Sequence, residues 1–154
     1  MRNSVLGLIG WLVASAVTGA VGAAYRPGVW YDNLVKPSLT PSDMVFPIVW
    51  NLLYIMMAFA AWRIWRECGF RCARVSLGLY IVQLVLNGAW MWLFFGLQLP
   101  GVALVEILLL WVILVAITIC FWRCSSLAGL LMLPYMLWVG FAAYLNYGLW
   151  RLNS

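Results

Sequence analysis

Aromatic and amide side chains recur at helical spacing in three apolar segments of this sequence. Gln83 and Asn87 are four residues apart, and Trp90 and Phe94 continue the same face of a helix. Trp and Tyr side chains offer large flat surfaces with a polar group, which suits a flat, largely apolar, conjugated ligand. Two other segments carry comparable faces, made of Pro47, Trp50, Tyr54 and Met57 with Asn51 beside them, and of Pro134, Tyr135, Trp138, Ala142 and Leu145 with Asn146 next.

The three faces together predict a cavity with aromatic and amide walls, in which the small Ala142 leaves room for a ring system. Taken singly, the same side chains fit another interpretation. Amides hydrogen-bond between membrane helices, and Trp and Tyr form belts at the membrane surface. Both interpretations stay open for any one residue, although eleven tryptophans exceed what two belts need.

Acid–base and metal chemistry have few candidates in the chain. It contains no His, the commonest general base and metal ligand. Glu106 is the one acid inside an apolar segment, and we expect it to reach the membrane surface or to pair with a helix end rather than to relay protons.

The four cysteines form two pairs with four-residue spacing, Cys68 with Cys72 and Cys120 with Cys124. A four-thiolate metal site or a redox switch is one interpretation. The spacing is not the usual one for zinc. We therefore expect no metal site, and four reduced thiols at a cytoplasmic membrane face.

The elements that hold these residues must lie in lipid. Of 154 residues 67% are hydrophobic and 8% charged, with a mean hydropathy of +1.01, whereas soluble domains carry about 25% charged residues. The first apolar run is too long for a typical signal peptide, so we expect it to be retained, although its Ala-rich end (Ala20, Ala23 and Ala24) leaves cleavage open as an alternative. The sequence predicts one domain over residues 1–154, an all-α membrane protein folded as a five-transmembrane-helix bundle, with helices at about 4–25, 44–65, 73–95, 101–122 and 126–150 and a long loop at 26–43.

The arginines and lysine predict the orientation of this bundle. Six lie on the N-terminal side (Arg2, Arg63, Arg66, Arg71, Arg74 and Arg123) and three on the other (Arg26, Lys36 and Arg151). The positive-inside rule then places the N-terminus in the cytoplasm, and we expect a bacterial membrane. The net charge of +5 is explained by these flanking residues, so no nucleic-acid partner is expected.

Ser15, Gly19 and Ala23 form a series of small residues in the first helix. Such a series indicates close helix packing, within one chain or in a dimer.

Four motifs resemble the TspO/translocator protein family, also called tryptophan-rich sensory proteins or peripheral benzodiazepine receptors. The family's first-loop pattern is matched at Trp30, Tyr31, Leu34, Lys36, Pro37 and Pro41, whereas Leu39 and Ser42 stand where the family usually has Trp and Pro. The other matches are Phe46-Pro47-x-x-Trp50-x-x-Leu53-Tyr54, Gln83-Leu84-x-x-Asn87-x-x-Trp90 with Phe94-Phe95-Gly96, and Pro134-Tyr135-x-x-Trp138-x-x-x-Ala142-x-x-Leu145-Asn146-Tyr147. They occur in the family's order and cover nearly the whole chain.

The resemblance implies a receptor, often a homodimer, whose ligand cavity is capped by the first loop. Family members bind protoporphyrin IX, isoquinolines and benzodiazepines, and some bind cholesterol, with no cofactor required. Carried over, the ligand set is Tyr31, Trp50, Tyr54, Asn87, Trp90, Trp138 and Ala142, and the lid set is Trp30, Lys36, Pro37 and Pro41. The loss of the loop Trp at Leu39 puts the lid contact there in question.

Further expectations follow from the resemblance and from the chemistry of a porphyrin ligand. Some bacterial members degrade protoporphyrin in light, which would give Trp50 and Trp138 a catalytic role, and a sterol or porphyrin transporter is another alternative. Leu145, Tyr147 and Arg151 fit a proposed sterol pattern, but an interfacial Tyr and a flanking Arg explain them as well. Lys36 or Arg26 is expected to meet a propionate at the rim. A metal-free tetrapyrrole fits better than haem, since no His or thiolate is expected in the cavity.

Overall fold

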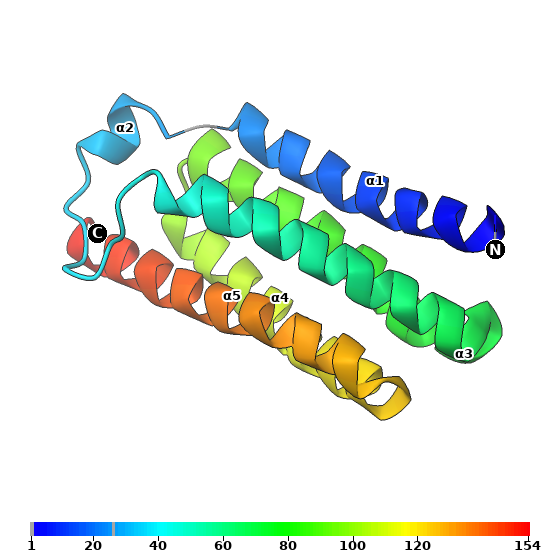
Figure 1. The fold of residues 1–154 in the computed structure, drawn as a ribbon. Helices are drawn as coiled ribbons and strands as arrows, with labels where there is room; N and C mark the ends of the chain where they lie inside the picture. Colours follow the sequence, from blue (N-terminus) through cyan, green and yellow to red (C-terminus); the bar gives the residue numbers. More distant parts are fainter. Residues whose placement is uncertain (1, 26) are drawn as a thin grey trace.

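The computed structural model describes residues 2–25 and 27–154, and it is helical almost throughout (Figure 1). No strand occurs in these ranges. The elements, in chain order, are α1 (Arg2–Ala24), α2 (Val29–Asp32), α3 (Val45–Met91), the π-helix η1 (Trp92–Gly96), α4 (Pro100–Cys124) and α5 (Ser126–Leu152). The predicted all-α class is confirmed. Of the described residues, those at the two ends of the chain lie at opposite ends of the bundle in Figure 1.

Helix α3 is a hairpin of two helices rather than one rod. Its 47 residues would measure about 70 Å, more than twice the thickness of a bilayer core. Gly69, with φ 68° and ψ 158°, interrupts it in a conformation that is essentially restricted to glycine. Hydrogen bonds from Tyr54 to Asn87 and from Gln83 to Met57 join residues placed symmetrically about this point, so the two halves run antiparallel.

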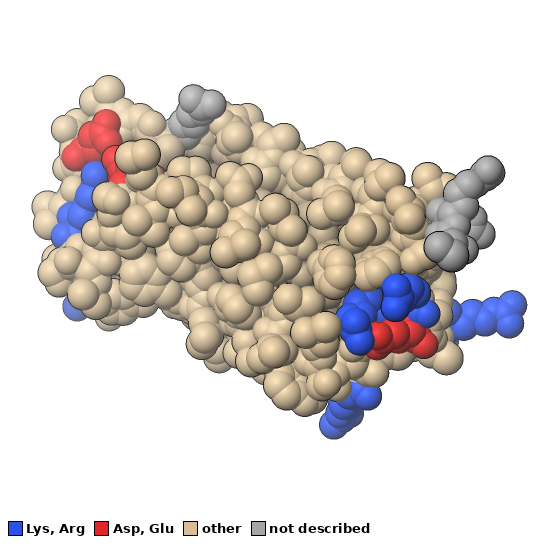
Figure 2. All heavy atoms as spheres, viewed as in Figure 1, with Lys and Arg blue, Asp and Glu red and all other residues tan. Residues whose placement is uncertain are grey.

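We call residues 45–68 the first half of α3 and residues 70–91 the second half. Counting Val45–Gly96 as one element, the described residues contain four helices long and apolar enough to cross a membrane. Because α3 folds back, these four make five crossings. Figure 2 agrees with this arrangement, since charged side chains gather at the two ends of the visible face and leave its middle uncharged.

The boundaries differ from the predicted ones mainly around Gly69. Residues 66–72 were expected to connect two spans, but all except Gly69 are helical, because one glycine with positive φ reverses the chain without a loop. The predicted third span ends in a π-helix, and the predicted loop 26–43 contains the short helix α2. Pro100 begins α4, one residue before the predicted start at 101, because its fixed φ suits the first position of a helix.

Helix α1 packs against both halves of α3 within the chain. The Ser15 hydroxyl lies 2.7 Å from the Tyr80 hydroxyl, and a Cβ on Gly19 would lie 3.1 Å from the Tyr54 ring. The series of small residues therefore serves close packing of α1 inside one protomer at these two positions.

The cysteines depart from the expectation of four reduced thiols. Cys68 and Cys124 form a disulfide that ties the α3 turn to the end of α4, and Cys72 and Cys120 are free and exposed. Spacing along the sequence pairs residues on one helix, whereas the fold brings together cysteines that are 56 residues apart. Disulfides persist mainly in oxidising compartments, so the thiols no longer support a cytoplasmic N-terminal side. That prediction continues to rest on the count of basic residues.

Side-chain contacts of Arg63 reinforce the same end of the bundle. Its guanidinium lies 2.7 Å from the Glu67 carboxylate and donates a hydrogen bond to the Ser125 hydroxyl between α4 and α5. Glu106 behaves differently: both of its carboxylate oxygens are buried without a hydrogen-bond partner among the described residues, so it does not pair with a helix end as expected.

Candidate functional site

A cavity of about 1080 Å³ opens at the end of the bundle that carries the long loop. This volume is slightly above the usual range of small-molecule sites, about 300–1,000 Å³. Helices α1, α3 and α5, with η1, form its walls, and α2 with the adjoining loop forms its cover. The lining residues are Leu12, Ala16, Gly19, Ala20, Gly22, Ala23, Tyr25, Pro27, Tyr31, Asp32, Asp43, Phe46, Pro47, Trp50, Asn51, Tyr54, Ile55, Asn87, Trp90, Met91, Phe94, Phe95, Ala142, Leu145, Asn146 and Leu149.

Aromatic rings form much of the inner wall. The Trp50 and Tyr54 rings lie 5.6 Å apart at a tilt of 31°, one helical turn from each other on the first half of α3. Opposite, the Trp90 ring stacks on Phe94 with centroids 5.0 Å apart, and Phe95 packs edge-on against Trp90. Such surfaces present π-faces and ring edges to an apolar ligand.

A chain of hydrogen bonds fixes the inner end of the cavity. The Tyr54 hydroxyl donates to Asn87 Oδ1 at 2.7 Å, and Asn87 Nδ2 donates to the Tyr135 hydroxyl at 3.0 Å. The Tyr135 hydroxyl donates in turn to Gln83 Oε1. Both ends of the Asn87 amide are therefore engaged within the protein, and the chain joins the two halves of α3 to α5.

A second amide, Asn146, anchors the opposite wall. Its Oδ1 accepts a hydrogen bond from the Trp90 indole at 3.0 Å, and its Nδ2 donates to the Pro100 carbonyl at 2.8 Å. The indole of Trp90 is thus held in one orientation from α5. The start of α4, where Pro100 lies, is fixed by the same side chain.

The cover is anchored to the bundle by its own residue Tyr31, whose side chain is 7% exposed. Its ring packs against Phe94 and Phe95, and the Lys36 ammonium lies 4.5 Å from the ring centroid. Burial, and then the charges of Asp43 and Asp32, raise the pKa of the Tyr31 hydroxyl. The phenol is therefore neutral at physiological pH, with its hydroxyl proton available.

The middle of the loop, at Val35 and Pro37, is held by Asn153 and by α5. The Val35 amide donates to Asn153 Oδ1 at 2.9 Å, and Asn153 Nδ2 donates back to the Val35 carbonyl at 3.0 Å. Pro37 packs so closely on Gly148 that a Cβ there would lie 2.5 Å from the proline ring. The cover is thereby attached to α5.

Six of the seven predicted ligand residues line this cavity: Tyr31, Trp50, Tyr54, Asn87, Trp90 and Ala142. Trp138 is not among the lining residues. Its ring packs against Phe46 and Phe141, and its indole N–H is buried without a hydrogen-bond partner among the described residues. That these residues contact a ligand stays a prediction.

The predicted lid residues belong to the cover and do not line the cavity. Trp30 packs edge-on against Phe94, Lys36 lies on Tyr31, and Pro37 rests on α5. Pro41 is half-buried, and Leu39 is exposed. Arg26, the other expected partner of a propionate, lies outside the described residues.

The residues of the sterol pattern do not share one surface. Leu145 is buried and lines the cavity, whereas Tyr147 and Arg151 are exposed on the outside of α5. A ligand on the outer surface would therefore not meet all three side chains.

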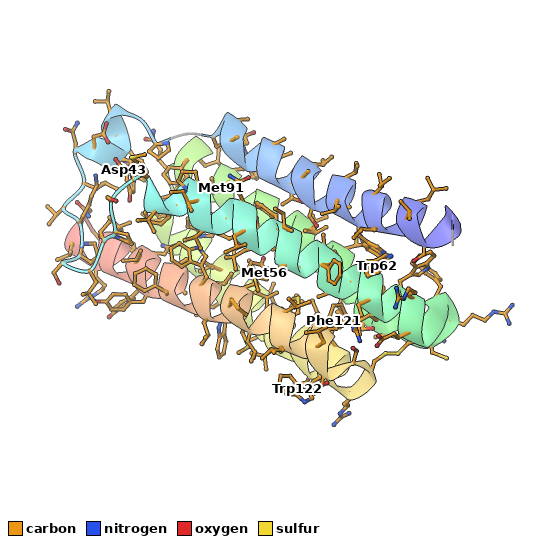
Figure 3. The ribbon with its side chains drawn as sticks, viewed as in Figure 1. Asp43, Met56, Trp62, Met91, Phe121 and Trp122 are labelled. Atoms are coloured by element: carbon orange, nitrogen blue, oxygen red, sulfur yellow. A yellow bond between two sulfur atoms is a disulfide. The ribbon has the colours of Figure 1, made fainter. Side chains whose placement is uncertain are left out.

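Sequence reasoning missed the contribution of α1 and of two acids. Ala16, Ala20 and Ala23 line the cavity although they carry no motif, because a small side chain contributes by leaving space. The series Ser15, Gly19 and Ala23 was attributed to helix packing alone, but Gly19 and Ala23 also line the cavity. Asp32 and Asp43 lie at the cavity mouth, and Figure 3 shows Asp43 at the loop end of the bundle.

Comparison with known proteins agrees with this architecture. A model of the TspO/MBR family matches residues 5–151. The chain is 39% identical to the tryptophan-rich protein TspO of Chlorobaculum tepidum, covering 99% of each protein. It is 39% identical to protein CrtK of Rhodobacter capsulatus, over 93% of this chain and 90% of the relative, and 39% identical to the human translocator protein, over 94% and 89%.

Proposed function

The chain belongs to the TspO/MBR family, and we propose that it is an integral membrane receptor for planar, largely apolar ligands of the porphyrin type. Protoporphyrin IX is the ligand we would test first. The observation that carries the proposal is the cavity of about 1080 Å³, walled by Trp50, Tyr54, Trp90 and Phe94. Sensing or sequestering a tetrapyrrole would require such a site and no cofactor.

The hydrogen-bonding pattern supports recognition by shape rather than by many polar contacts. The amides of Asn87 and Asn146 are already satisfied by protein partners. A ligand therefore meets few free amide groups, and the buried apolar area supplies most of the binding free energy. The charged described residues at the cavity mouth are Asp32 and Asp43, so acidic substituents of a ligand are better placed towards Lys36.

Filling the cavity tests the proposal. Ala142→Phe adds a ring inside the cavity, whereas Leu137→Phe places a ring on the exposed face of the same helix, outside the cavity. In a titration of nanodisc-embedded protein, followed by the absorption band of protoporphyrin IX, Ala142→Phe should weaken binding by about tenfold or more. Leu137→Phe should bind as the wild type does. Equal affinities in both folded variants would reject the cavity as the binding site.

Light-dependent degradation of the bound porphyrin is a second candidate. The observation that favours it is Trp50, an oxidisable indole that lines the cavity and whose ring lies 6.0 Å from Tyr135. Under illumination in air, Trp50→Phe should slow bleaching of bound protoporphyrin IX. Trp138→Phe should have a smaller effect, because Trp138 does not line the cavity. Bleaching that is insensitive to both substitutions would leave a receptor without this activity.

A further inference from the structure

Several residues that line the cavity are also exposed. Ile55, on the first half of α3, is 57% exposed although it lines the cavity, and the neighbouring Asn51 is exposed too. On α1, the lining residues Ala16 and Ala20 are exposed. By contrast, the lining residues Leu145, Asn146 and Leu149 on α5 are buried. Among the helical walls, the exposed lining residues lie on α1 and on the first half of α3, which indicates a side opening of the cavity between these two helices.

The way α1 packs explains where this opening lies. Near its start, α1 contacts the first half of α3 closely: the Trp62 indole donates to the Ser4 carbonyl at 2.7 Å, and a Cβ on Gly7 would overlap the Trp65 ring. Figure 3 shows Trp62 beside α1 at this end.

Towards the loop, α1 turns to the second half of α3. Trp11 packs on Tyr80, and a Cβ on Gly22 would lie 3.4 Å from Met91. There the Tyr54 ring reaches α1 from the first half of α3, at Gly19, while the alanines beside it leave space.

The depth of the opening places it in the hydrocarbon layer. At 1.5 Å per residue, Ile55 lies about 15 Å along the helix from Val45, near the middle of a bilayer core about 30 Å thick. Leu12, at the other edge, is near the middle of α1. The opening therefore faces acyl chains rather than water.

We propose that ligands enter and leave the cavity sideways, from the hydrocarbon layer, through the opening between α1 and the first half of α3. The inference rests on the proposed function in taking the cavity as the binding site. It adds the route of entry, and the route restricts the class of ligand. Such ligands dissolve in the bilayer and are planar, and the part that passes the opening carries no net charge. The cover, attached to α5 through Asn153, stays in place during exchange.

Narrowing the opening tests the route. The probe is protoporphyrin IX dimethyl ester carried in detergent micelles and mixed with the protein in the same detergent, with binding followed by porphyrin fluorescence in stopped flow. Ile55→Trp and Ala16→Phe should slow association and dissociation together, each by about tenfold, so that affinity changes less than either rate. The matched controls are Leu52→Trp and Val13→Phe, which alter side chains 58% and 55% exposed that do not line the cavity. Both should keep the wild-type rates.

A variant with a loosened cover tests the alternative route, in which ligands pass under the cover. If ligands pass under the cover, Asn153→Ala should speed exchange and the narrowing variants should not slow it, and this outcome would overturn the side route. The side route predicts that Asn153→Ala changes both rates by less than about twofold.

A measurement without porphyrin keeps this inference separate from the proposed function. Trp50 lines the cavity, and its fluorescence is obtained by subtracting the emission spectrum of Trp50→Phe from that of the wild type. In vesicles of brominated phosphatidylcholine that emission should be quenched, and Ala16→Phe should relieve the quenching. No quenching would reject the side opening, even if porphyrin binds. Quenching without saturable porphyrin binding would reject the proposed ligand and retain the opening.

Discussion

The hydrogen bond between Tyr54 and Asn87 joins the two halves of α3, and both residues line the cavity. Asn87→Ala removes two hydrogen bonds, of 2.7 Å to Tyr54 and 3.0 Å to Tyr135, while Tyr135 keeps its bond to Gln83. Side-chain hydrogen bonds between membrane helices contribute about 0.6 kcal/mol on average and up to about 1.7 kcal/mol. We therefore expect Asn87→Ala to lower the free energy of unfolding by about 1–3 kcal/mol, and Tyr54→Phe, which removes one bond, by about half as much.

A double-mutant cycle in Tyr54→Phe, Asn87→Ala and the combined variant isolates the contact. Unfolding by denaturing detergent, measured in mixed micelles, gives the four free energies, and we expect a coupling of about 0.6–1.7 kcal/mol. Ser76→Ala is a control, since the Ser76 hydroxyl donates to the Ala73 carbonyl within its own helix and joins no second helix among the described residues. A coupling of zero, with both single variants folded, would show that the amide does not hold the Tyr54 ring in place and would refute the reasoning.

Three further predictions concern the ends of the bundle. Gly69→Ala should lower the free energy of unfolding by about 1–3 kcal/mol, because φ 68° and ψ 158° strain any residue with a side chain. Gly78→Ala, inside regular helix with open space around it, should be neutral or stabilising, and thermal unfolding of the two variants distinguishes them. Asn153→Ala should speed hydrogen exchange of the Val35 amide by mass spectrometry, since that amide loses its acceptor, and unchanged exchange would mean that the cover is held elsewhere. Thiol titration of the unfolded chain should find two reactive thiols before reduction and four afterwards, whereas four at the outset would contradict the disulfide at Cys68.

The fold was largely predictable because lipid leaves few options for the backbone. Apolar runs long enough to cross the membrane must be helical, and the prolines and charges between them mark the ends. The turn at Gly69 was less accessible to prediction. A single residue with positive φ replaces a loop there, and no periodic pattern distinguishes such a glycine from the glycines inside regular helices.

The candidate site was predicted where large side chains carry the signal. Trp50, Tyr54 and Trp90 stand at helical spacing, and helical phase is enough to bring them to one cavity. Trp138 shows the limit of helical phase as a guide: it lies on the predicted face of its helix, but its indole packs against Phe46 and does not line the cavity. The alanines of α1 were missed as lining residues because empty space leaves no mark in the sequence.

The central claim is that the cavity under the first loop accepts a planar guest, and a structure of the protein determined with protoporphyrin IX tests it most directly. The account predicts flat density between Trp50 and Ala142, with Tyr54 still bonded to Asn87 and the cover attached at Asn153. Density on the outer surface of the helices, with the cavity left without porphyrin, would contradict it.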